Sequence, residues 1–78
     1  MILEEIYYAK TEGDKWVKLL VTPEEAEQIK DYLDTIKTPV ASGYIALPFE
    51  MNRFFPVTYF QAIKFNDNVW DAVLGWRE

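Results

Sequence analysis

The side chains best suited to chemistry in this chain are carboxylates that recur at a helical spacing. One row repeats every three or four residues and consists of Glu24, Glu27, Asp31 and Asp34. This spacing places the row on one face of a helix, with neighbouring carboxylates about 5–6 Å apart. Charge rows of this kind are usually solvated helix faces. The functional interpretation is a surface that imitates a phosphate backbone or docks on a basic partner.

Most other catalytic side chains are missing from the sequence. There is no Cys and no His, which excludes a thiolate zinc site, a cysteine nucleophile and a Ser-His-Asp triad. The adjacent carboxylates of Glu4 and Glu5 would point to opposite faces of a strand, and no acidic group has EF-hand spacing. The glycines are isolated, so no phosphate-binding loop occurs. We therefore predict a protein that is not an enzyme and that uses no metal and no cofactor.

Two tryptophans near the end of the chain, Trp70 and Trp76, add a second kind of candidate. In a chain of 78 residues such side chains are more often core than interface. If either were exposed, it would be a candidate anchor for a partner, because Trp is enriched among interface hot spots. The candidate partner-binding residues are therefore Glu24, Glu27, Asp31, Asp34, Trp70 and Trp76.

The segment 49–65 is rich in Phe and Tyr, which suggests either core packing or a stacking platform for single-stranded nucleic acid. A stacking platform also needs a basic groove, and only Arg53 and Lys64 are basic in this segment. Core packing is therefore the favoured interpretation.

The formal net charge of −5 argues against direct binding to nucleic acid or to an anionic membrane and favours basic partners. The longest uncharged run, 38–49, is well short of the ~20 apolar residues that a membrane helix needs.

The N-terminal residues lack the basic region of a secretory signal, and the absence of Cys fits a cytoplasmic location. The length predicts a single domain over 1–78.

The clearest element is a helix over residues 22–37. Thr22 is a suitable N-cap, Pro23 suits the first helical position, and Glu25 completes a capping box. Lys37 complements the C-terminal end of the helix dipole, and Pro39 ends the helix. The apolar stripe opposite the acidic row consists of Ala26, Ile29, Leu33 and Ile36.

Alternating and β-branched segments predict strands on both sides of this helix. Segments 2–10 and 15–21 form a hairpin around a turn that contains Gly13, with Val17, Leu19 and Val21 on the inward face. Further strands are predicted over 44–47, 54–57 and 62–65.

The C-terminal segment 69–77 has two interpretations. A short helix capped by Asn68 fits its i,i+4 apolar pairs, and a last strand paired across the break at 66–68 is the alternative. The predicted fold is α+β: a small antiparallel sheet, made of the N-terminal hairpin and two or three further strands, packed against one central helix.

These features predict a small acidic binding module that acts by protein–protein contact as a regulator or inhibitor. Phages and mobile elements encode proteins of this size and charge, and such a module could compete with nucleic acid for a basic partner. The alternative is a structural or assembly protein that forms a homo-oligomer through surplus aromatic side chains.

Overall fold

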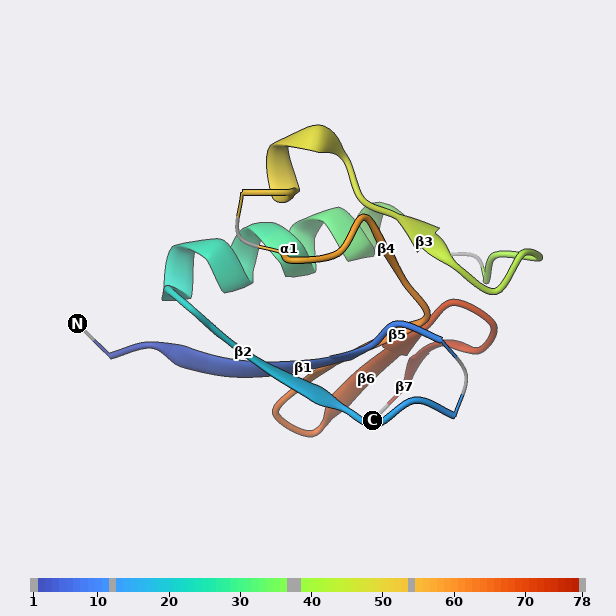
Figure 1. Cartoon of the computed structure of the whole chain (residues 1–78), viewed down its shortest axis with the longest axis horizontal. Helices are drawn as coiled ribbons and strands as arrows, with labels where there is room; N and C mark the ends of the chain where they lie inside the picture. Colours follow the sequence, from blue (N-terminus) through green and yellow to red (C-terminus); the bar gives the residue numbers. More distant parts are fainter. Residues whose placement is uncertain (1, 12, 37–38, 54, 78) are drawn as a thin grey trace.

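The computed structural model describes residues 2–11, 13–36, 39–53 and 55–77. One α-helix lies on one face of a five-stranded antiparallel sheet of order β2-β1-β5-β6-β7, and the two-stranded sheet β3-β4 lies on the same side (Figure 1). The elements are β1 (Glu4–Ala9), β2 (Val17–Val21), α1 (Pro23–Thr35), β3 (Ile45–Ala46), a 3₁₀ turn (Phe49–Met51), β4 (Tyr59–Phe60), β5 (Ala62–Phe65), β6 (Asn68–Asp71) and β7 (Gly75–Arg77). The predicted α+β architecture is confirmed.

The N-terminal hairpin is formed as the alternation predicted. Glu4 lies opposite Val21 and Tyr8 lies opposite Val17 in a regular antiparallel register. Gly13 adopts a φ of 85° in the connecting turn, a conformation that costs glycine little because it has no Cβ. The hairpin places β1 in the interior of the sheet and leaves β2 at its edge.

Helix α1 begins with the predicted capping box. The Thr22 hydroxyl accepts a hydrogen bond from the Glu25 backbone N–H at 3.1 Å, and the Glu25 carboxylate accepts one from the Thr22 N–H at 3.0 Å. The helix ends at Thr35, so it is two residues shorter than predicted, and Lys37 lies outside the described residues. No helix in the described part of the chain is long and apolar enough to cross a membrane.

The core lies between the apolar stripe of α1 and the inner face of the sheet. Ile29 and Leu33 of α1 are completely buried, as are Ile63 of β5 and Trp70 of β6. The aromatic segment contributes to this core as predicted, because Phe55, Phe60 and Phe65 are buried in it.

The helix predicted over 69–77 is wrong, and the alternative of a strand is correct. Asn66, with a φ of 52°, and Asp67 reverse the chain directly after β5, and β6 then pairs with β5 so that Trp70 lies opposite Ile63. Asn tolerates this left-handed conformation better than most residues. The Asp71 carboxylate accepts hydrogen bonds from the N–H groups of Val73 and Leu74 at 2.7 and 3.1 Å, which shapes the turn into β7. The hydrogen bonds between β5 and β6 therefore determine the structure of this segment, and the i,i+4 spacing of its apolar residues does not.

The strand predicted over 54–57 is also wrong. Pro56 has no N–H to donate to a ladder, and the strand forms later, where Tyr59 lies opposite Ala46 and Phe60 opposite Ile45. The Tyr32 hydroxyl donates a 2.8 Å hydrogen bond to the Ala46 carbonyl and thereby joins α1 to this small sheet. Phe54 lies outside the described residues.

The inward face predicted for the second strand is only partly formed. Val21 is buried and Leu19 is half-buried, but Val17 is 47% exposed, contrary to prediction. The reason is that β2 is an edge strand, which has no neighbour on its outer side.

The capping box generates a stability prediction. Replacing Thr22 with Ala should lower the free energy of unfolding by about 1 kcal/mol, because the Glu25 N–H loses its acceptor. Urea denaturation followed by circular dichroism measures the change. Thr35→Ala is the matched control: among the described residues its hydroxyl bonds only the Tyr32 carbonyl, within the last turn, so no loss of this size is expected. A Thr22→Ala variant as stable as the wild type would contradict the capping role.

Tyr32 generates a prediction for alkaline pH. Burial raises the pKa of Tyr32 above its usual value of 10.0, so the neutral hydroxyl is favoured in the folded state. The contribution of the neutral Tyr32 side chain to the free energy of unfolding is complete below pH 10.0. It is lost as the pH rises through the higher pKa of the folded state. Tyr32→Phe should therefore lose less stability than the wild type above that pH, and should be about 1 kcal/mol less stable at neutral pH because the Ala46 bond is missing. Urea denaturation across this pH range measures the free energy of unfolding, with Tyr44→Phe as a control for the loss of a hydroxyl. The same pH dependence of stability in the wild type and both variants would contradict the role assigned to Tyr32.

Candidate functional site

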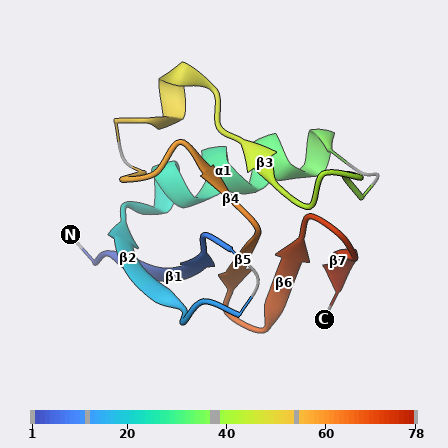
Figure 2. The same ribbon diagram turned by 45° about the vertical axis from the view of Figure 1, so that its right-hand side comes forward.

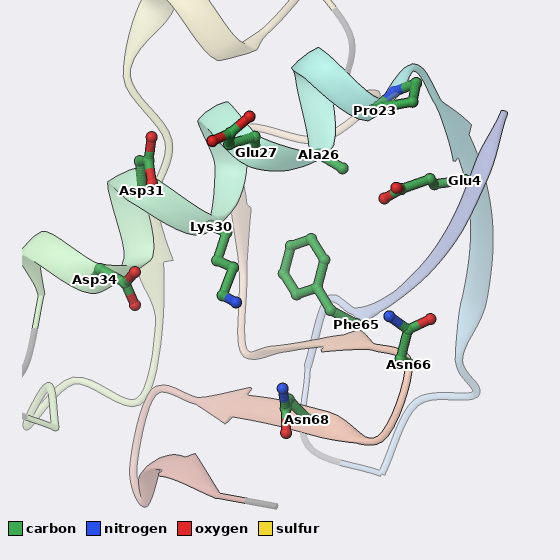
Figure 3. Close-up of a pocket in the computed structure, with 10 residues that line it drawn as sticks. All are labelled: Glu4, Pro23, Ala26, Glu27, Lys30, Asp31, Asp34, Phe65, Asn66 and Asn68. Atoms are coloured by element: carbon green, nitrogen blue, oxygen red, sulfur yellow. The ribbon is translucent and has the colours of Figure 1, made fainter. Parts of the chain in front are cut away.

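An acidic groove runs along one side of α1, between the helix and the ends of several strands (Figure 3). Its carboxylates come from two elements: Glu27, Asp31 and Asp34 from α1, and Glu4 from the start of β1. Phe65, Asn66 and Asn68, around the β5–β6 turn, line the side opposite the helix. Pro23, Ala26 and Lys30 complete the lining, and the volume is about 500 Å³.

The sheet register explains why Glu4 belongs to this groove. Glu4 pairs with Val21, two residues before α1 begins, so the start of β1 lies near the N-terminal end of the helix. Ile6 pairs with Phe65, which brings the β5–β6 turn to the same end of the sheet. The three carboxylates on α1 follow from helical spacing alone, whereas the position of Glu4 depends on pairing between strands.

A smaller hollow of about 320 Å³ continues the groove toward the end of the chain. It is lined by Trp76 and Arg77 of β7 together with Lys30, Asp34 and Asn68, which also line the acidic groove. Trp76 is half-buried, and its indole N–H is inaccessible to solvent. The ring therefore offers only apolar surface at this end of the groove, because its N–H is buried and cannot reach a ligand there.

The groove carries a formal charge of −3, from four carboxylates and the Lys30 ammonium. Within the described residues, none of these carboxylates forms an ion pair or accepts a hydrogen bond. The described residues also contain no group of three or more acidic side chains arranged to hold a metal ion. Carboxylates spread along a groove suit several separate cations, such as the lysines and arginines of a basic segment, better than a single metal ion.

The structure brings four of the six predicted site residues together. Glu27, Asp31, Asp34 and Trp76 line the groove or its continuation. Glu24 is exposed on the same helix but does not line the groove.

The sixth predicted residue, Trp70, is a correction to the sequence-based list. It is completely buried, so it cannot contact a partner of the folded protein. The reason is its register in β6, which places it opposite Ile63 on the core side of the sheet.

The most exposed tryptophan is one that the sequence analysis did not include among the candidate residues, Trp16. Trp16, which directly precedes β2, is 43% exposed and was not selected from the sequence. The Lys64 ammonium lies 5.9 Å from the centre of its ring and 5.7 Å from that of Tyr7, on the face of the sheet opposite α1. The sequence holds no local signal for this exposure, because it follows from the edge position of β2.

No protein-family model, curated protein or solved structure matches this chain. The interpretation of the groove therefore depends on its geometry and charge.

The contrast between the two tryptophans is testable. Trp70→Ala should cost about 3–5 kcal/mol, enough to unfold a domain of this size, because it empties the centre of the core. Trp16→Ala should cost less than about 1 kcal/mol because much of its ring is already in water. Urea denaturation followed by far-ultraviolet circular dichroism measures both. Equal losses for the two variants would contradict the assigned core.

Proposed function

We propose that this chain is a small non-catalytic binding module whose acidic groove holds a basic segment of a partner protein. One observation carries the proposal: four carboxylates from two elements line a single groove, and none has a partner among the described residues. Unpaired carboxylates on a surface are well solvated, so they cost the fold little and stay available for a partner.

The energetics favour a partner that makes several contacts. A single exposed ion pair contributes only about 0.2–1 kcal/mol, so one lysine would not be held. A segment with basic residues at successive positions would engage Glu27, Asp31 and Asp34 in turn. The ring of Trp76 at the far end can pack against the aliphatic stem of a lysine or arginine.

The same arrangement supports a role as regulator or inhibitor. Neighbouring carboxylates about 5–6 Å apart along α1 resemble the spacing of backbone phosphates, so a segment that binds nucleic acid would also fit the groove. Occupation of that segment would compete with nucleic acid. Under this proposal the module works in the cytoplasm, binds neither nucleic acid nor membrane itself, and is of the kind that phages and mobile elements encode.

The alternative of an assembly protein held together by surplus aromatics receives less support. Three rings of the aromatic segment, Phe55, Phe60 and Phe65, are used in the core, and Tyr59 is 38% exposed. Among the described rings of that segment the most exposed is Phe49, at 86%, on the 3₁₀ turn.

Titration with a decalysine peptide tests the groove. The double variant Glu27→Gln/Asp31→Asn keeps the shape of both side chains but removes two groove charges, and should weaken binding by about 2- to 30-fold. Glu24→Gln removes one charge from the same helix outside the groove and should change affinity by less than about 2-fold. Added salt should weaken the wild-type complex. Calorimetry at low salt measures all three proteins, and equal losses for the groove and control variants would contradict the proposal.

Capture from a cell lysate extends the test to the natural partner. A protein retained by the wild type and by Glu24→Gln, but lost with the double variant, would be the expected partner. Recovery of the same proteins on all three baits would count against the groove as the binding surface.

A further inference from the structure

Strand β2 presents an open edge to solvent (Figure 2). It pairs with β1 on one side only, and within the described residues no hydrogen bond is made from its other side. Natural edge strands are usually protected by proline, by a bulge, by several charges or by a covering segment. β2 has the sequence VKLLV and a continuous register with β1, so its only such protection is Lys18.

The side chains of this edge are apolar and exposed on both faces of the sheet. Val17 is 47% exposed on the face that carries α1, where Leu19 is half-buried. Leu20 is 51% exposed on the opposite face. The alternation of Val17, Leu19 and Val21 is typical of a strand with one face in a core, yet this chain alone covers only Val21 completely.

We propose that β2 pairs antiparallel with β2 of a second copy of this chain. The two five-stranded sheets then form one continuous sheet around a two-fold axis at Leu19. This axis is perpendicular to the sheet, so both copies of α1 lie on the same face. The pairing satisfies the open backbone groups of both edges at once.

The sequence of β2 favours one register for this pairing. With Leu19 opposite Leu19, all five residues overlap, Val17 lies opposite Val21, and Lys18 lies opposite Leu20. A register centred on Lys18 would place two ammonium groups directly opposite each other. A register centred on Leu20 would place Val17 opposite Pro23, which has no N–H and already begins α1.

The surrounding charges permit this contact. The Glu5 carboxylate lies 3.6 Å from the Lys18 ammonium and reduces repulsion between the two copies of Lys18. None of the residues that line the acidic groove belongs to β2, so the strand pairing itself uses no groove residue. The other edge strand, β7, has only three residues and contains Gly75, so it offers a shorter ladder.

The interface also has a distinctive salt dependence. Each copy carries a formal charge of −5, while the five residues that pair at the interface carry one charged side chain, Lys18, which lies beside Glu5. Screening of the overall repulsion should therefore strengthen dimerisation as salt is added. Binding of a basic segment in the groove has the opposite dependence, so failure of one proposal is distinguishable from failure of the other.

Sedimentation velocity over a range of concentrations tests the dimer. Leu20→Lys should weaken dimerisation at least about 10-fold, because each new lysine lies opposite Lys18 of the other copy. Within its own sheet residue 20 lies opposite Glu5, so the fold is retained, which circular dichroism checks. Leu74→Lys makes the same change at a residue 59% exposed in the β6–β7 turn and should leave dimerisation unchanged.

A charge exchange completes the test. Adding Lys18→Glu to Leu20→Lys places opposite charges across the proposed interface and should restore the dimer. A wild type that stays monomeric at high concentration, a dimer insensitive to Leu20→Lys, or an assembly larger than a dimer would each overturn the proposal, because pairing of the two β2 edges closes at two copies.

Discussion

The packing of one apolar helix stripe against one face of the sheet is the constraint on which the rest of the structure depends. Ile29 and Leu33 are completely buried, and so is Trp70 from the sheet. A chain of this size forms one core, so the rotation of α1 that buries Leu33 also sets the direction of every other side chain on the helix. Asp31 and Asp34 consequently lie outside the core, and both line the groove beside the helix.

The two candidate surfaces use different physics and different parts of the sheet. The acidic groove lies where β1, β5, β6 and β7 present residues to α1, and it depends on charge. The β2 edge lies on the far side of β1 and depends on backbone pairing and apolar contact. The two proposed surfaces share no residue, so each can be altered without changing the residues of the other.

The uncovered face of the sheet adds an asymmetry of charge. The strand registers place five side chains side by side across it: Lys18, Tyr7, Lys64, Val69 and Arg77. Three of these are cations, although the chain as a whole carries a net charge of −5. Glu5 also lies on this face and pairs with Lys18, whereas the four carboxylates of the groove lie on the helix side.

The sequence alone determined the elements that depend on neighbouring residues. The capping box of Thr22 and Glu25, the stripe and acidic row of α1, the N-terminal hairpin and the limits of β5 all follow from periodicity and from hydrogen bonds over short distances along the chain. Only the tertiary structure decided what depends on strand pairing: the two strands at the C-terminal end, the burial of Trp70, the exposure of Val17 and the place of Glu4 in the groove. Register joins residues that are far apart in the chain, and shifting it by one residue exchanges the faces of every side chain, so local patterns do not contain this information.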